Sequence, residues 1–360
     1  MAGDNIHRSP NGRRWVARWR TPDNRTRKKT FDTKAQAKAH LARMRVDVTE
    51  RTYVDDARSK VLFMDFAEQW RQSPLRHHRP STAAQVESYL TNHAYDTLGN
   101  YRLNRITGEI LQNWVNDLEQ TLAPSTVETV ARHVRTILNS AVDERLLSAT
   151  PWTSQVKLPE RAKTEIQWLT SAQVHEIADT IPPRYRALVL FMAATGCRPA
   201  EAFGVTLDRL NLDEGAVTIN RQLLTGRGGV AFGPLKTKAA ARTVPFGQRT
   251  VGLLNEHLDA YGVGPDELVF TNGKTEPIRR NRFGEVWRTT MLKLTDIEAR
   301  GPHQLRHFYA SGLIRQGESM TTVQSRLGHS SITETSTTYA HLWEDSDETT
   351  RAASELIVWG

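Results

Sequence analysis

The chain carries the stretch Gly301-Pro302-His303-Gln304-Leu305-Arg306-His307, and three other clusters in its C-terminal half are also marked by basic residues. They are Thr195-Gly196-Cys197-Arg198-Pro199-Ala200-Glu201, Leu235-Lys236-Thr237-Lys238 and Leu327-Gly328-His329, with Tyr339 ten residues after the last histidine. His303 and Arg306 are three residues apart, so a helix that starts after Pro302 would present both on one face. These clusters indicate one site rich in cations.

Two arginines in such a site suit the breaking of a phosphodiester. The reaction passes through a pentacoordinate state with extra negative charge on the non-bridging oxygens, which positioned cations stabilise more than the ground state. A guanidinium is planar, always charged and able to donate to two oxygens at once. We therefore predict that Arg198 and Arg306 clamp the phosphate.

The order of these clusters resembles that of the tyrosine recombinases of the bacteriophage (lambda-type) integrase kind. The matching elements are T-G-x-R-x-x-E, K-T-K, H-x-L-R-H, L-G-H and T-Y-x-H, and the resemblance covers residues 165–345. It implies a site-specific DNA recombinase, a phage or mobile-element integrase that serves viral genome integration. Such an enzyme cuts and rejoins DNA through a 3′-phosphotyrosyl intermediate and a Holliday junction, as a homotetramer on DNA, without ATP or metal.

The resemblance also implies roles for single residues. Tyr339 matches the nucleophile, and a phenol with an ordinary pKa of ~10 needs a base or a cation to favour its deprotonation. His303 matches a phosphate donor and general acid or base, because a histidine pKa near neutrality permits either role. His329 matches a histidine that donates to a non-bridging oxygen. Glu201 is expected to orient groups of the site rather than to react.

The departing 5′ hydroxyl needs a proton, for which the resemblance points to a lysine at the tip of a hairpin between two strands. Lys236 matches the first lysine of the K-T-K element, and Lys238 is the alternative. His307 and His341 match histidines that are common in the family, and no role is assigned to them.

The positive charge of the chain lies at its N-terminal end. Residues 1–60 hold 16 Lys/Arg and 7 Asp/Glu, whereas the other 300 hold 32 and 33. Residues 12–31 alternate as a hairpin with a turn at 21–24, and a helix capped by Asp32 or Thr33 follows. We expect a small sheet plus one helix, an arm-type DNA-binding domain whose DNA contacts include Arg14, Arg18 and Arg20.

Residues 61–158 are predicted to form an all-α domain, which the resemblance implies is the core-binding domain. The expected helices are 62–72, 81–98, 107–120 and 125–147, with starts at Ser81 and Ser125 after prolines. Arg79, Arg132 and Arg135 are expected to contact phosphates, although a solvated helix face explains them about as well.

A polar linker is expected at 159–164, followed by an α+β catalytic domain at 165–360 that includes a C-terminal tail. Its predicted helices are 171–180, 184–195 and 199–205, and its predicted strands are 216–223, 230–235 and 242–245. The apolar end, residues 356–359, needs a surface to cover, either on a neighbouring protomer or on its own domain. The whole is a multidomain, mainly α fold.

Several classes of function are excluded. No run approaches the ~20 apolar residues of a membrane span, and no signal peptide is visible, so we expect a cytoplasmic protein in a bacterial host cell. One cysteine, Cys197, rules out a disulfide framework and a cysteine zinc cluster. The segment 226–229 lacks the Lys-Ser/Thr of a P-loop. We expect no metal and no cofactor.

The partner is expected to be double-stranded DNA, at core and arm-type attachment sites. A host bending factor and an excision factor are further partners that the resemblance leaves open. Two other functions remain as alternatives: a type IB topoisomerase, which shares the phosphotyrosine chemistry, and a DNA-binding regulator that has kept the fold.

Overall fold

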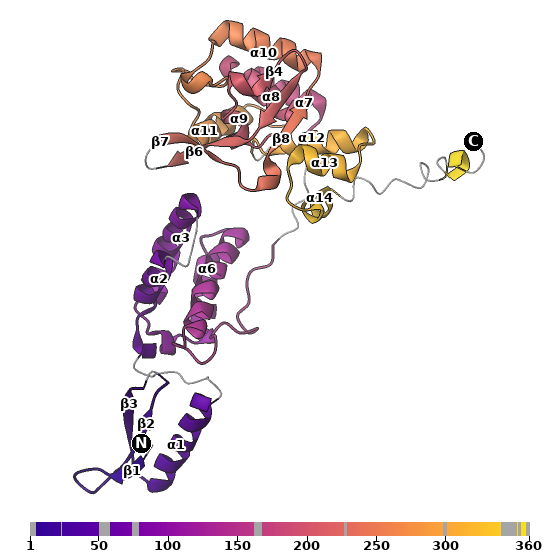
Figure 1. Cartoon of the computed structure of the whole chain (residues 1–360). Helices are drawn as coiled ribbons and strands as arrows, with labels where there is room; N and C mark the ends of the chain where they lie inside the picture. Colours follow the sequence, from indigo (N-terminus) through magenta and orange to yellow (C-terminus); the bar gives the residue numbers. More distant parts are fainter. Residues whose placement is uncertain are drawn as a thin grey trace. The chain divides into compact units, whose positions relative to one another are not determined.

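The computed structural model describes residues 5–22, 24–49, 58–73, 79–161, 168–226, 229–297, 301–339, 351 and 354–357. Contacts divide the chain into two compact units, Met1–Lys163 and Thr164–Gly360, and each is taken by itself below. Helices dominate both units, and the sheets are small and antiparallel (Figure 1). The predicted mainly α fold is therefore confirmed. Residues 162–164 of the predicted linker 159–164 lie outside the described residues.

The N-terminal part is a three-stranded sheet covered by one helix. Its elements are β1 (Asn5–Arg8), β2 (Trp15–Arg20), β3 (Thr26–Phe31) and α1 (Lys34–Thr49), with β2 in the centre. The predicted hairpin gains β1 as an added edge strand, and Asp23 of the predicted turn lies outside the described residues. Trp19 of β2 packs on Leu41 of α1 in a small core. Thr33 caps α1: its hydroxyl accepts from the Gln36 N–H, and the Gln36 side chain accepts from the Thr33 N–H.

Short helices pack around an apolar core in the rest of the first unit. They are η1 (Arg58–Lys60), α2 (Phe63–Gln72), α3 (Pro80–His93), α4 (Tyr95–Leu98), η2 (Leu103–Arg105), α5 (Gly108–Glu119) and α6 (Pro124–Asp143). The predicted serine caps are wrong: Pro80 and Pro124 are themselves the first helical residues, a position where the missing N–H costs nothing. The predicted helix 81–98 breaks at Ala94.

The longest described helix of this bundle, α6, contributes many residues to its core. Val127, Val130, Val134 and Ile137 recur at helical spacing and are fully buried. The indole N–H of Trp70 donates to the hydroxyl of Ser140 at 2.9 Å, which satisfies both polar groups inside the core. The opposite side of α6 remains exposed to solvent.

The described part of the second unit contains two small sheets, β4-β5-β8 and β6-β7, packed with helices. Its helices are α7 (Ser171–Thr180), η3 (Pro183–Tyr185), α8 (Arg186–Thr195), α9 (Pro199–Phe203), η4 (Leu207–Arg209), η5 (Lys238–Ala240), α10 (Gln248–Tyr261), η6 (Pro265–Glu267), α11 (Arg280–Met291), α12 (Gln304–Arg315), α13 (Met320–Leu327) and α14 (Ile332–Tyr339). Its strands are β4 (Leu210–Asn211), β5 (Ala216–Ile219), β6 (Arg221–Gly226), β7 (Gly229–Pro234) and β8 (Arg242–Pro245).

The predicted strand 216–223 is in fact two strands. It is interrupted at Asn220, so β5 pairs with β4 and β8, whereas β6 pairs only with β7. At the centre of the unit, α8 is buried along most of its surface and contacts α7, α10 and α12. Because α8 is held on several sides, the turn that follows it has a fixed position, and Arg198 lies in that turn.

Candidate active site

Arg198 enters the site from the turn that ends α8. Gly196 has a φ of +62°, and a Cβ there would lie 2.3 Å from the Tyr309 ring, so both backbone and space require glycine. Arg198 then stands at the N-cap of α9, followed by Pro199 as the first helical residue. The Thr-Gly-x-Arg-Pro stretch is thus a helix end joined directly to a helix start.

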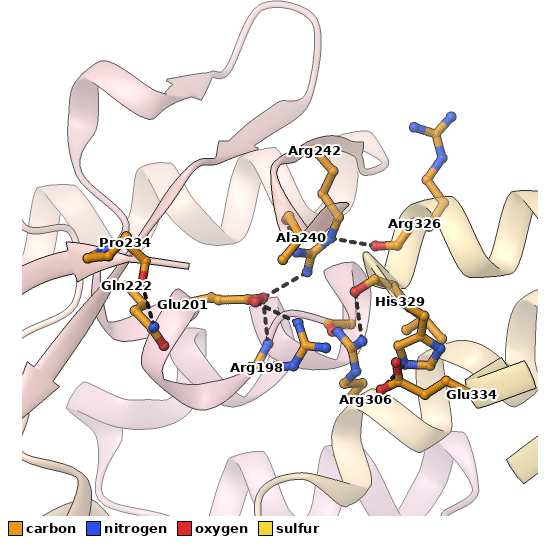
Figure 2. A network of polar contacts seen from close by, with 12 residues as sticks. Arg198, Glu201, Gln222, Pro234, Ala240, Arg242, Arg306, Arg326, His329 and Glu334 are labelled. Atoms are coloured by element: carbon orange, nitrogen blue, oxygen red, sulfur yellow. Dashed lines mark hydrogen bonds and ion pairs between the residues drawn. The ribbon is translucent and has the colours of Figure 1, made fainter. Parts of the chain in front are cut away.

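Glu201 holds Arg198 in place. Its carboxylate accepts from the Arg198 N–H at 3.0 Å and from Arg198 Nη1 at 2.8 Å (Figure 2). Glu201 is 2% exposed. Burial alone would raise its pKa, but the guanidinium groups of Arg242 and Arg198 hold the pKa below the ordinary value. Glu201 is therefore an ionised carboxylate that accepts hydrogen bonds from two arginines, Arg198 and Arg242.

Arg242 is the residue that the sequence analysis missed. Its Nη2 donates to Glu201 at 2.8 Å, its Nε to the Arg326 carbonyl at 2.7 Å, and its Nη1 to the Ala240 carbonyl at 2.8 Å (Figure 2). Arg242 is buried and joins β8, α9, η5 and the end of α13. In the sequence Arg242 is only the first residue of a predicted strand, and its partner Glu201 is 41 residues away.

Arg306 lies at the centre of the site and is 1% exposed. It donates through Nη1 to the Gly196 carbonyl at 2.8 Å and through Nη2 to the Leu327 carbonyl at 2.7 Å. The Thr-Gly and Leu-Gly turns are thereby tied to α12. Burial, together with the charge of Arg198, lowers the pKa of Arg306 to about 10, so the guanidinium remains charged at neutral pH.

His303 is the N-cap residue of α12, so it stands just before the helix that was predicted to carry it, and the residue as a whole is exposed. Desolvation of the ring and then the charges of His307 and Arg306 lower its pKa to about 4. The rings of His303 and His307 meet edge-on, with centroids 5.1 Å apart. The two imidazoles thus lie one turn apart on the side of α12 that carries Arg306.

His329 follows the turn that ends α13. Gly328 has a φ of +65°, and a Cβ there would lie 2.9 Å from the Ala240 Cα, so the glycine lets α13 approach η5. The His329 ring is buried, with Nδ1 2.9 Å from the Thr335 hydroxyl and Nε2 3.7 Å from the Glu334 carboxylate. Burial and the charges of Arg306 and Arg198 lower its pKa to about 4. His329 is a neutral imidazole beside two arginines.

Tyr339, the last residue of α14, is 1% exposed. Its hydroxyl lies 2.8 Å from Nδ1 of His307, and its ring lies 5.9 Å from that of Trp168. Burial raises the pKa of the phenol to about 12. The hydroxyl of the predicted nucleophile therefore contacts α12. It is buried and hydrogen-bonded to His307, to which the sequence analysis assigned no role.

Lys236 lies between β7 and β8, which correspond to the predicted second and third strands, and it is exposed. The two strands belong to different sheets, so this connection is not the tip of a hairpin. Lys238 begins η5, and its side chain is not among those described, so both lysines remain candidates.

The six arginines predicted to contact DNA are all exposed and all belong to the first unit. Arg14 pairs with Asp32 at 3.1 Å, and Arg20 donates to Asn24 at 2.9 Å. Arg132 and Arg135 lie on the exposed side of α6, and Arg79 is the N-cap residue of α3. Arg306 belongs to the second unit.

Two other features of the site bear on its chemistry. Burial raises the pKa of the Cys197 thiol to about 11, so this cysteine is a packing residue and no thiolate nucleophile. Among the described residues no group of three or more His, Cys, Asp or Glu side chains could hold a metal ion. In the same part of the chain no helix is both long enough and apolar enough to span a membrane.

Comparison with known proteins identifies both units. The Phage integrase family profile matches residues 167–345, and the profile of the phage integrase N-terminal SAM-like domain matches residues 62–119. The chain is 25% identical over 293 residues to a tyrosine recombinase XerC-like protein of Caldanaerobacter subterraneus subsp. tengcongensis, covering 73% of this chain and 75% of that protein. It is 28% identical over 272 residues to tyrosine recombinase XerD of Bifidobacterium longum, covering 69% and 81%.

Solved structures agree in fold. The Tn1549 transposon integrase, solved with a circular intermediate DNA, superposes with a TM-score of 0.72 at 18% identity, covering 82% of this chain and 99% of that one. A lambda integrase dimer bound to a core site superposes with a TM-score of 0.61 at 15% identity, covering 95% of both chains. Two profiles of one family match successive parts of the sequence, and the chain therefore belongs to the phage integrase family of site-specific tyrosine recombinases.

Proposed function

We propose that the protein is the integrase of a phage or another mobile element, and that it cuts and rejoins DNA through a 3′-phosphotyrosyl bond. The observation that carries the proposal is the cluster formed by Arg198, Arg306, His303 and His329, with Tyr339 one hydrogen bond from α12. Burial and then the charges of Arg306 and Arg198 lower the pKa of His329, so positive charge lies close to its ring. A phosphate that enters there meets several donors.

In the proposed reaction each group has one task. Tyr339 attacks the scissile phosphorus, forming the Tyr–O–P bond as the P–O5′ bond breaks. Arg198 and Arg306 stabilise the added charge on the non-bridging oxygens, and neutral His303 and His329 donate to the same oxygens. Lys236, or Lys238 in its place, gives a proton to the departing 5′ oxygen. A free 5′ hydroxyl then attacks the phosphotyrosine of a partner strand, so bond energy is conserved.

Two rounds of this exchange would pass through a Holliday junction on a homotetramer. A lambda integrase tetramer has been solved bound to a Holliday junction. Its fold matches this chain with a TM-score of 0.62, covering 92% of this chain. Leu356 and Ile357 near the C-terminus are 75% and 82% exposed. We propose that they dock on a neighbouring protomer, with docking on their own domain as the alternative; truncation after Asp347 should then weaken tetramer formation but spare monomer binding.

The N-terminal domain, residues 1–60, is proposed to bind arm-type DNA sites. On the sheet face turned away from α1, Arg18 stands directly opposite Lys28. Two like charges in that register destabilise a sheet, and a bound polyanion would remove the repulsion. The lambda integrase structure covers 95% of this chain, which is consistent with a mobile-element role rather than that of a chromosome-dimer resolvase.

The domains are proposed to divide the DNA between them. Residues 61–158, with Arg79, Arg132 and Arg135, would bind the core site together with the catalytic domain at 165–360, in the cytoplasm of the host cell. Host bending and excision factors could join this complex. Removing residues 1–60 should abolish integration that depends on arm sites, spare cleavage of short core duplexes, and reduce the fall of affinity with salt. Equal integration by the truncated chain would contradict the arm assignment.

One experiment separates the three candidate functions. The attachment site is first located by footprinting on the DNA that flanks the gene, and two differently labelled duplexes bearing it are incubated with the protein. A recombinase gives a covalent protein–DNA adduct and recombinant product, a type IB topoisomerase gives the adduct alone, and a regulator gives neither. Recombinant product is the expected result.

A further inference from the structure

We infer that His307 is the proton acceptor for the Tyr339 hydroxyl when that oxygen attacks phosphorus. The inference rests on the proposed function and assigns a task to a side chain that otherwise has none. Nδ1 of His307 lies 2.8 Å from the Tyr339 oxygen. This is the distance of a direct O–H···N hydrogen bond.

The surroundings of His307 favour its neutral form, which is the form that can accept. Burial and the adjacent Arg306 charge lower its pKa below the ordinary value. The charged and titratable groups that face it are His303 and Arg306 on its own helix and Tyr339 on α14, and His329 lies near enough to feel its charge. None of them carries a negative charge at neutral pH that would favour an imidazolium.

The phenol, in turn, needs an acceptor. Tyr339 is enclosed by Ala310, Val323, Leu327 and Trp168, and its pKa of about 12 makes the free phenolate rare at neutral pH. An acceptor in contact with the oxygen allows the proton to leave as the O–P bond forms, so no free phenolate is needed. His307 follows Arg306 on α12, so this acceptor stays beside the predicted phosphate clamp if Tyr339 moves toward a bound phosphate.

The proton balance closes over the whole cycle. In cleavage the Tyr339 proton passes to Nδ1 of His307, the Tyr–O–P bond forms, the P–O5′ bond breaks, and a lysine protonates the 5′ oxygen. In strand transfer the incoming 5′ hydroxyl gives its proton to that lysine, and the imidazolium of His307 returns a proton to Tyr339 as it departs. No further reactant is required.

The decisive variant is His307→Asn, because the Asn amide oxygen occupies the place of Nδ1 and can accept a hydrogen bond but cannot take the proton. On a nicked suicide duplex bearing the crossover site, we expect cleavage to fall by ~10²–10⁴-fold. Replacing Tyr339 by a ring-fluorinated tyrosine, whose phenol is more acidic, should restore much of the loss in this variant and change the wild type little. The rate of the variant should rise with pH where the wild-type rate is flat.

A matched control is Trp168→Phe, which alters the packing around both Tyr339 and His307 but leaves the phenol and the imidazole in place. Its rate against pH should keep the wild-type shape, and fluorination should not raise it. A purely positional role for His307 is indicated instead if His307→Asn cleaves at the wild-type rate, or if fluorination restores nothing, and the inference then fails.

A measurement on the intact protein does not depend on any variant. With ¹⁵N-labelled histidine, the Nδ1 resonance of His307 at neutral pH should be that of an unprotonated acceptor. A protonated Nδ1 would mean that His307 donates to Tyr339, which contradicts the inference. If the wild type forms no covalent adduct, the proposed function fails, and the tautomer of His307 still decides whether it can accept.

Discussion

At the scale of single residues, the two predicted clamp arginines differ in how many of their hydrogen-bond donors are already paired within the protein. Both described hydrogen bonds of Arg306 go to backbone carbonyls, so this arginine holds two turns together as well as supplying charge. Arg198 is more open, with 24% of its side chain exposed, and its described contact through Nη1 goes to Glu201. Arg198 is therefore the arginine whose chemical role can be tested with least damage to the fold.

We expect Arg198→Lys to reduce cleavage by ~100-fold or more while DNA binding and the melting temperature stay close to those of the wild type. An ammonium can still pair with Glu201 but cannot donate to two phosphate oxygens from one plane. Arg186→Lys is the control, because Arg186 makes an exposed pair with Asp179 and should cleave normally. Near-normal cleavage by Arg198→Lys would remove it from the clamp.

Gly328→Ala tests the tight turn before His329. The φ of +65° and the contact of 2.9 Å with the Ala240 backbone predict a loss of ~1–3 kcal/mol in the free energy of unfolding. A Cβ added at Gly312, inside α12, would meet no atom within 4 Å. Gly312→Ala should therefore raise the free energy of unfolding of the second unit by up to ~1 kcal/mol. Chemical denaturation of both variants measures the contrast, and equal effects would contradict it.

At the scale of elements, the sequence predicts those helices and strands that local residue patterns determine. The helix 171–180 and the strand 242–245 match to the residue, because capping residues, apolar spacing and flanking turns all agree there. The break at Asn220 and the added strand β1 were missed, since strand pairing depends on partners far along the chain. The same holds in the site: Arg198 and Glu201 are neighbours in sequence, whereas Arg242 and the burial of Tyr339 depend on tertiary contacts.

Both candidates for the general acid, Lys236 and Lys238, lie between β7 and β8, and their variants can be compared directly. Lys236→Ala should lose most of its cleavage activity on ordinary DNA and regain much of it on a duplex with a 5′-bridging phosphorothiolate, because a thiolate leaves without a proton. Lys238→Ala should cleave both substrates at comparable rates. If the two variants exchange behaviour, Lys238 is the acid.

At the scale of the whole molecule, the second unit folds around groups that resist protonation. The pKa values of His303 and His329 fall to about 4, and those of His307 and Glu201 are also lowered. Between pH 4 and the ordinary histidine value of ~6.5, the unfolded chain therefore binds more protons than the folded one. The stabilisation is present above that range and is lost as the pH falls through it.

Urea unfolding followed at several pH values should show the free energy of unfolding of the second unit rising from pH 4.5 to pH 6.5 and then levelling. His329→Asn should flatten part of the slope, because it removes one of the titrating groups. A free energy that falls as the pH rises through this window would contradict the lowered pKa values of these histidines.

The most direct test of the central claim is to find the residue that joins the DNA. The wild-type protein is incubated with a nicked suicide duplex bearing its crossover site, the SDS-resistant adduct is digested, and mass spectrometry locates the nucleotide. The account predicts a 3′-phosphotyrosyl bond on Tyr339, with Tyr339→Phe binding the duplex normally and forming no adduct. An adduct on another residue, or one that persists in Tyr339→Phe, would contradict it.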